Sequence, residues 1–243
     1  MTDFLVDIPT PHGLMNTFVA KPNQPGRHPV VLFYMDAFGV REELYEMARR
    51  IASLGYMAVL PNLYYRKTRH FEMPPGEAGM AAMFAMMGHL DNAAAVSDTA
   101  ALLEYVDGSP FADASRIGEV GYCMSGPFVI AAAARYPRRI QCIAVIHGAN
   151  LVTDNADSPH RLAESLECES YVACAEVDKW ASPADIAALE AGLARSGSTY
   201  DIEWYAGARH GFVFPQRAGA YSQAGADQHW DRLESLFDRC LRR

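Results

Sequence analysis

The fold is decided by residues 117–126, which read IGEVGYCMSG. An apolar strand leads into Gly-x-Cys-x-Ser-Gly, and a helix rich in small residues follows at once. This is the strand–turn–helix arrangement of a nucleophile elbow, with Cys123 where serine is usual. Gly121 and Ser125, two residues on either side, leave room for the close packing that such a turn requires. The helix that follows Cys123 would stabilise a thiolate through its unpaired N–H groups and its dipole.

Strand and helix patterns alternate outward from this segment. Short apolar runs predict strands, most of them buried on both faces, over Val30–Tyr34, Met57–Leu60, Ile117–Gly121, Ile140–Ile146, Tyr171–Ala175 and Thr199–Tyr205. Helical spacing predicts helices over Glu42–Leu54, Ala93–Tyr105, Gly126–Tyr136, Ser182–Arg195 and Gln223–Cys240. Alternating residues on both sides of a turn at 10–13 predict an N-terminal antiparallel hairpin. We therefore expect an α/β fold with a mostly parallel central sheet and helices on both faces.

Residues 73–92 fit this alternation least well, because they contain five methionines and a Pro-Pro-Gly turn. One interpretation is a flexible apolar cap over a pocket, since methionine adapts to ligands of different shapes. The interpretation that we favour is a helix whose apolar stripe faces the core, because apolar residues at helical spacing usually serve packing.

Composition excludes several classes of protein. The 243 residues include 21 Lys+Arg and 29 Asp+Glu, a formal charge of −8, and half of them are apolar. This is a globular chain without the basic surface that nucleic acids or anionic membranes require, and we expect a single domain over residues 1–243. No apolar run approaches the ~18 residues of a membrane span. The five cysteines form no CxxC pair, which suits neither a disulfide framework nor a zinc site and points to the reducing cytoplasm. No cofactor or metal is expected.

A cysteine nucleophile needs a base and an acid that orients the base. His210 lies in a glycine-flanked loop directly after the last predicted strand, and Asp178 lies just beyond the strand Tyr171–Ala175. The order Cys123, Asp178, His210 is the nucleophile–acid–base order of the α/β-hydrolase fold. Among the other histidines only His147 competes, because it also follows an apolar strand; for His147 we favour a core histidine with satisfied hydrogen bonds.

The alternative for Cys123 is a buried structural cysteine, the common fate of an intracellular thiol. We disfavour it because the strand, turn and helix around Cys123 are present independently. We assign this structural role to the remaining four cysteines, Cys142, Cys168, Cys174 and Cys240.

The chain resembles the dienelactone hydrolase family over nearly all of its length. The resemblance is carried by Gly121–Gly126, the Asp178 loop, His210–Phe212, Met35–Arg41 and Pro61–Arg66. It implies a Cys-His-Asp hydrolase that opens lactones or cleaves activated esters. It also implies an oxyanion hole formed by the backbone N–H groups of Ala37 and Met124.

Two positions depart from the family pattern. Asp36 stands where the family has a glutamate that interacts with the resting thiol, so Asp36 is expected to modulate the nucleophile. Phe214 stands four residues after His210, where members acting on dienelactone have an arginine that holds the substrate carboxylate. An apolar side chain cannot pair with a carboxylate, so dienelactone itself is not the expected substrate.

The predicted partner is a small-molecule ester or lactone. Candidate pocket residues, chosen from the same segments, are Phe38, Tyr64, Arg66, His147 and Trp180. The competing hypothesis is a protein without hydrolytic activity, which binds a ligand or senses oxidants through a reactive Cys123. It predicts that no activity of the protein would depend on His210.

Overall fold

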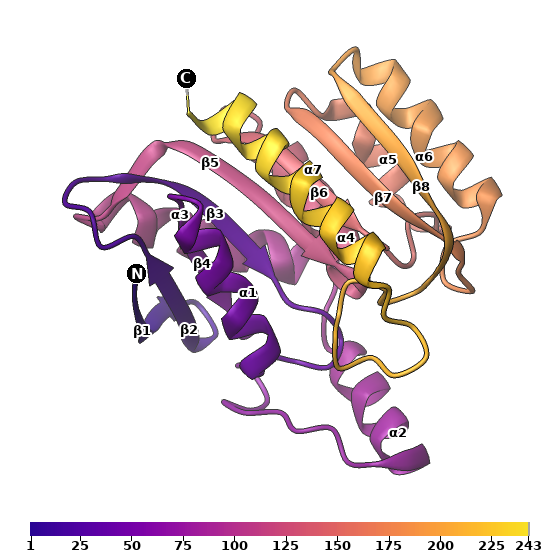
Figure 1. The fold of residues 1–243 in the computed structure, drawn as a ribbon, viewed down its shortest axis with the longest axis horizontal. Helices are drawn as coiled ribbons and strands as arrows, with labels where there is room; N and C mark the ends of the chain where they lie inside the picture. Colours follow the sequence, from indigo (N-terminus) through magenta and orange to yellow (C-terminus); the bar gives the residue numbers. More distant parts are fainter. Residues whose placement is uncertain (243) are drawn as a thin grey trace. The chain divides into compact units, whose positions relative to one another are not determined.

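The computed structural model describes residues 1–242, which contain two compact units, one spanning Met1–Ile117 and one beginning at Gly118 (Figure 1). Strands and helices alternate along both units. β3–β4, β6–β7 and β7–β8 are parallel pairs, whereas β1–β2 and β2–β4 are antiparallel. The predicted fold class is therefore confirmed. The single domain expected over residues 1–243 stays a prediction.

The first unit contains β1 (Thr2–Thr10), β2 (Gly13–Lys21), β3 (His28–Tyr34), α1 (Glu42–Ser53), β4 (Met57–Pro61), α2 (Gly76–Met87) and α3 (Asn92–Gly108). β1 and β2 form the predicted hairpin, in which Thr10 pairs with Gly13 across the turn. β2 runs antiparallel to β4, and β4 runs parallel to β3. Every residue of Val30–Tyr34 in β3 is completely buried, as expected for a strand covered on both faces.

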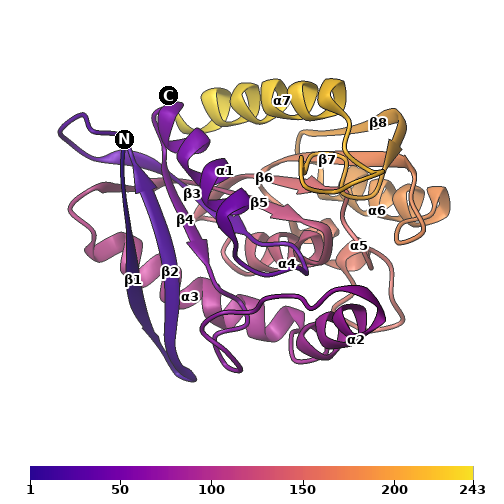
Figure 2. The same cartoon turned by 60° about the horizontal axis from the view of Figure 1, so that its bottom comes forward.

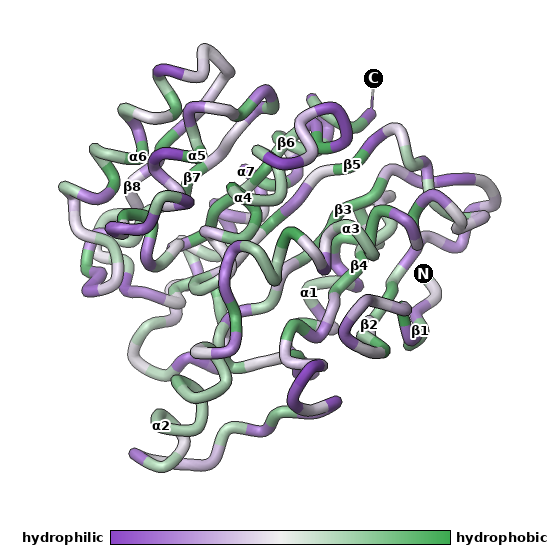
Figure 3. Tube along the Cα trace, turned by 180° about the vertical axis from the view of Figure 1, so that it is seen from behind, coloured by the Kyte–Doolittle hydropathy of each residue, from purple (hydrophilic) through white to green (hydrophobic). Residues whose placement is uncertain are grey.

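The core-facing stripe that we favoured for residues 73–92 is wrong for α2. A helix does form, but its buried residues are Gly79 and Met83, while Met80 and Phe84 are 38% and 44% exposed. Apolar residues surround this helix instead of following one face, so most of them lie outside the core (Figure 3). The alternative role as a cap stays a prediction.

The second unit is entered through β5 (Ala112–Tyr122) and continues with η1 (Cys123–Ser125), α4 (Gly126–Arg135), β6 (Ile140–Ile146), α5 (Pro159–Leu162), η2 (Ala163–Ser165), β7 (Glu169–Val177), α6 (Pro183–Ser196), β8 (Tyr200–Arg209) and α7 (Gln223–Leu241). β6, β7 and β8 are parallel neighbours in that order. Figure 2 shows α4 and α7 on opposite faces of these strands. Because β6, β7 and β8 are parallel, their carboxyl ends meet at one edge of the sheet, where α/β folds bind ligands.

Local capping interactions fix both ends of α6. α6 begins after Ser182, whose side chain accepts the N–H of Asp185 while the carboxylate of Asp185 accepts the N–H of Ser182. It ends at Gly197, which adopts the left-handed conformation that glycine favours (φ 73°). None of the helices within residues 1–242 is long and apolar enough to cross a membrane.

Candidate active site

Cys123 directly follows β5 with φ 56°, a left-handed conformation that is uncommon for residues other than glycine and marks strained turns at functional sites. Gly121 makes this turn possible, because a Cβ there would lie 2.4 Å from the carbonyl oxygen of Ser125. A Cβ on Gly126 would lie 2.9 Å from the Cα of Gly148. The elbow therefore uses Gly121 as predicted, and it also depends on Gly126, which the sequence identified only as a helix start.

Four side chains occupy the first position after a strand of the second unit. Cys123 follows β5, His147 follows β6, Asp178 follows β7 and His210 follows β8. Since β6, β7 and β8 are parallel, the last three side chains lie at one edge of the sheet. The structure thus brings the predicted base and acid together with His147.

His210 and Asp178 form a short hydrogen bond, with His210 Nδ1 2.7 Å from Asp178 Oδ2. The other carboxylate oxygen accepts the backbone N–H of Trp180 at 2.8 Å, which fixes the orientation of the carboxylate. The Asp178 side chain is 2% exposed and the His210 side chain 15%. The predicted acid–base contact is present, and the main chain of Trp180 supports it in a way that the sequence did not reveal.

The second nitrogen of this imidazole, His210 Nε2, is buried and makes no well-directed hydrogen bond to any residue in 1–242. Cys123 nevertheless influences the proton affinity of the His210 ring. Burial lowers the pKa of His210, but the hydrogen bond to Asp178 and the interaction with Cys123 outweigh burial and raise that pKa to about 9. A loose contact between nucleophile and base is common in enzymes without bound substrate.

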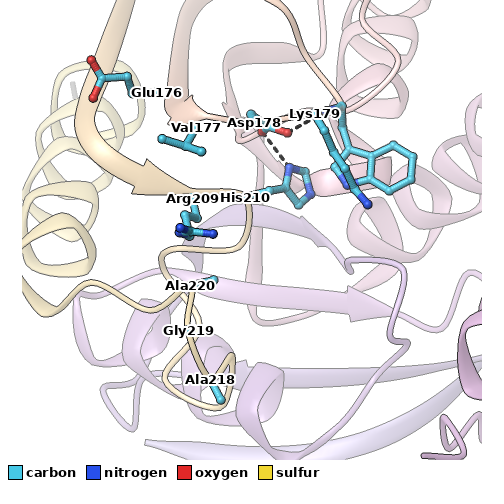
Figure 4. A pocket seen from close by; sticks show the side chains of 10 residues that line it. Glu176, Val177, Asp178, Lys179, Arg209, His210, Ala218, Gly219 and Ala220 are labelled. Carbon is cyan, nitrogen blue, oxygen red and sulfur yellow. Dashed lines mark hydrogen bonds and ion pairs between the residues drawn. The ribbon is translucent and has the colours of Figure 1, made fainter. Parts of the chain in front are cut away.

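A depression of about 800 Å³ borders this pair (Figure 4). Asp178 and His210 line it together with Glu176, Lys179, Trp180 and Arg209, and the small residues 218–220 also line it. Figure 4 shows Arg209 and Lys179 on either side of His210. A molecule that approaches His210 from this side would meet two cationic side chains, one further carboxylate and an indole.

His147 is buried as we favoured, but its hydrogen bonds are not satisfied. The residue is 1% exposed, and neither ring nitrogen has a hydrogen-bond partner among residues 1–242. The expectation of a satisfied core histidine is therefore wrong in that respect. The ring of His147 meets the ring of His210 edge to face, with 4.8 Å between centroids, and His147 and Asp178 line one narrow internal cavity.

Met124, a predicted oxyanion-hole residue, is buried directly after Cys123. The other predicted site residues lie in the first unit, and they are Asp36, Ala37, Phe38, Tyr64 and Arg66. Asp36 is completely buried and accepts hydrogen bonds from Arg41 at 2.6 and 3.3 Å. The Tyr64 hydroxyl donates to the carbonyl oxygen of Ala37 at 2.9 Å. Arg41 therefore offsets the charge of Asp36, and the modulating role of Asp36 and the oxyanion hole of Ala37 and Met124 stay predictions.

Arg66, a candidate pocket residue, is paired within its own unit. Its guanidinium donates to both oxygens of Asp98 at 2.7 and 2.8 Å. Asp98 is completely buried and also accepts the hydroxyl of Tyr65 at 2.8 Å. Because the charge of Arg66 is used by a buried carboxylate, Arg66 is poorly suited to bind an anionic substrate.

All five cysteines are free. Burial raises the pKa of the Cys142 thiol well above its usual value and raises those of Cys168 and Cys174 to about 12, so these thiols stay protonated and unreactive. Cys240 is half-buried and donates to Glu169. Within residues 1–242, no group of three or more His, Cys, Asp or Glu side chains could hold a metal ion.

The chain is similar to known proteins over most of its length. The profile of the Dienelactone hydrolase family matches residues 15–241. A protein of Synechocystis sp. named "Putative carboxymethylenebutenolidase" is 27% identical over 241 residues, covering 98% of this chain and 97% of the relative. The carboxymethylenebutenolidase of Rhodococcus opacus is 26% identical over 227 residues, covering 89% and 83% of the two chains.

A solved structure has the same fold. The crystal structure of a "Putative Dienelactone Hydrolase" from Klebsiella pneumoniae superposes with a TM-score of 0.85 at 22% identity, covering 97% of this chain and 98% of the other. The family profile covers nearly the whole sequence, from residue 15 in β2 to residue 241, the last residue of α7. The chain therefore belongs to the dienelactone hydrolase family.

Proposed function

We propose that the protein hydrolyses carboxylic esters or lactones with Cys123 as nucleophile, His210 as general base and Asp178 as the group that orients His210. The observation that carries this proposal is the 2.7 Å hydrogen bond between His210 and Asp178, on an imidazole that also interacts with Cys123. The relatives named carboxymethylenebutenolidase support the same class of reaction.

Two half-reactions follow from this arrangement. The thiol proton of Cys123 moves to His210, and the thiolate attacks the carbonyl carbon of the substrate. The backbone N–H groups of Met124 and Ala37 are proposed to hold the oxyanion, as the family resemblance implies. The alcohol leaves with the proton from His210, and a thioester on Cys123 remains. Water then attacks the thioester while His210 accepts its proton, which releases the acid and restores the thiol.

The nucleophile restricts the substrate. A thiolate is itself a good leaving group, so the tetrahedral intermediate returns to substrate unless the departing oxygen leaves comparably well. Enol lactones, aryl esters and thioesters meet this requirement, whereas alkyl esters and amides meet it poorly. We therefore propose activated esters or enol lactones as substrates.

Dienelactone itself is a poor candidate. Phe214, which stands where members acting on dienelactone have arginine, is completely buried, and its ring lies 5.6 Å from that of His147. It cannot pair with a carboxylate. Arg41 and Arg66, the charged groups of the two upstream segments, are already paired with Asp36 and Asp98.

The proposal is tested by hydrolysis of 4-nitrophenyl acetate, phenyl acetate and ethyl acetate by the wild type, Cys123→Ala and His210→Ala. We expect kcat/KM to fall in that order of esters for the wild type, and each substitution to lower it by about a thousandfold or more. Cys240→Ala removes a half-buried thiol that has no imidazole partner and serves as the matched control. Mass spectrometry of the quenched reaction should find an acetyl group on Cys123.

Two outcomes would count against the proposal. Turnover of ethyl acetate faster than that of phenyl acetate, with acylation rate-limiting, would exclude the thioester route. A Cys123 that reacts with peroxide, in a protein whose activities are all indifferent to His210→Ala, would favour the redox role instead.

A further inference from the structure

His147 is a buried imidazole that the proposed triad does not use. It directly follows β6 with φ 38°, and its backbone N–H donates to the carbonyl oxygen of Ala173 at 2.8 Å, which fixes its place between β6 and β7. Its side chain has no hydrogen-bond partner within residues 1–242, although it is 1% exposed. A buried polar group without a partner destabilises the folded state.

The surroundings of His147 would suit an apolar ring. Tyr122, Phe212 and Phe214 lie with ring centroids 6.1, 5.7 and 5.6 Å from it, and all three are completely buried. Phenylalanine at position 147 would fill such a site without burying unpaired nitrogens. The ring of His210 lies nearer to His147 than these three rings do, at 4.8 Å with 62° between the ring planes. The imidazole of His147 is therefore placed to act on His210.

The charges around the two rings keep His147 neutral. Burial lowers the pKa of His147 well below its usual value, and His210, Arg217 and His229 lower it further. His210 itself faces Asp178 and Cys123, which favour its protonated form. The pair thus consists of a neutral ring, which retains a nitrogen lone pair, beside a ring that becomes cationic.

We propose that His147 is a positioning residue for the hydrolysis proposed above: its neutral imidazole holds the ring of His210 in the orientation that bonds Asp178, and stabilises that ring while it carries the proton of Cys123. The proton passes from Cys123 Sγ to His210 Nε2, and the proton on Nδ1 stays with Asp178. His147 takes up no proton. It acts through a nitrogen lone pair, which attracts a neighbouring cation.

Two substitutions separate this role from simple packing, because they predict opposite orders. His147→Phe retains an aromatic ring in the apolar site but removes both nitrogens, whereas His147→Asn retains a polar acceptor and tolerates a positive φ. We expect His147→Phe to stay folded and to melt close to the wild-type temperature, because the fit of an apolar ring offsets the strain of a bulky residue at positive φ, with kcat lowered about tenfold and KM within twofold. His147→Asn should melt lower but recover part of kcat per folded molecule. A packing role would instead leave His147→Phe fully active and impair His147→Asn.

A second readout does not depend on catalysis. Titration of ¹³C- and ¹⁵N-labelled histidines by NMR should show the pKa of His210 lowered by about one unit in His147→Phe. His229→Phe serves as the control. It removes another buried imidazole, which forms a hydrogen bond with Tyr122, and it should leave the pKa of His210 unchanged. An unchanged His210 pKa together with wild-type kcat in His147→Phe would overturn the inference. Absence of esterase activity in the wild type would instead overturn the proposed function, while the titration would still test the pairing.

Discussion

Asp98 on α3 and Asp178 after β7 both bury a carboxylate and pair it with a nitrogen base at 2.7 Å. Asp98 is bound by the two terminal guanidinium nitrogens of Arg66 and by the hydroxyl of Tyr65, and none of these groups changes its protonation near neutral pH. Asp178 is bound by an imidazole and by one backbone N–H. The two sites differ in one respect, which is whether the partner can exchange a proton under working conditions. That difference separates a structural ion pair from a candidate catalytic pair.

The largest expected effect comes from removing the charge of Asp178. Asp178→Asn should lower kcat/KM for 4-nitrophenyl acetate by about 10³–10⁴-fold, because an amide cannot hold His210 in the required tautomer or stabilise its protonated form. Rates are normalised to the folded fraction measured by circular dichroism. A variant that keeps more than a tenth of wild-type activity would show that Asp178 does not orient the base.

The matching substitution at the other carboxylate should affect stability instead. Asp98→Asn leaves the guanidinium of Arg66 without its counter-charge, and we expect the free energy of unfolding to fall by roughly 3 kcal/mol. Activity per folded molecule should stay within about twofold of the wild type. Asp113→Asn, in an exposed pair with Arg116, should change the free energy of unfolding by less than about 1 kcal/mol. Equal effects of the two substitutions would remove the distinction between buried and exposed pairs.

The pH dependence of stability should also distinguish the two sites. The pKa of His210 rises from 6.5 in the unfolded chain to about 9 in the folded protein, so the folded state holds this proton more tightly. The resulting stabilisation is complete below pH 6.5 and is lost as the pH rises through 9; its full size is on the order of 3 kcal/mol. Denaturant titrations at pH 6, 7.5 and 9 should show this decrease in the wild type and a smaller decrease in Asp178→Asn, which retains only the contribution of Cys123. A parallel decrease in both proteins would assign it to other groups.

The smallest expected effect concerns the start of α6, which follows the Asp178 loop. Ser182→Ala removes one half of the capping box with Asp185 and should lower the free energy of unfolding by about 1 kcal/mol without changing kcat. Equilibrium unfolding in urea measures the first quantity and the esterase assay the second. A loss of kcat would show that the helix start also determines the geometry of Asp178.

Sequence alone predicted the parts of the site that depend on local pattern. The predicted strands stop at Gly121, Ile146, Ala175 and Tyr205, whereas β5, β6, β7 and β8 end at Tyr122, Ile146, Val177 and Arg209, so three of the four ends were placed one to four residues too early. Cys123, Asp178 and His210 were still chosen as candidates because each lies shortly after a predicted strand, and parallel strands bring their carboxyl ends to one edge. The expected enzyme class, a hydrolase of this family, is confirmed by the family match.

The remaining features depend on contacts between distant segments, which leave no local pattern. Arg66 and Asp98 are 32 residues apart, and nothing near Arg66 indicates that its charge is already used. The unpaired nitrogens of His147 result from aromatic rings contributed by β5 and by residues 212–214. The exposure of α2 also depends on distant neighbours. An apolar composition predicts burial whichever neighbours are present, so the sequence could not predict this exposure.

The hydrogen bond from the backbone N–H of Trp180 to Asp178 has a consequence for how this protein can change. The acid is oriented by an atom that every residue except proline possesses, while the indole of the same residue lines the depression beside His210. Mutation at position 180 can therefore alter what the depression accepts while the backbone hydrogen bond that orients Asp178 is retained. Natural variation or a directed library at residues 179, 180 and 209 could diversify ligand preference while the chemistry is inherited intact.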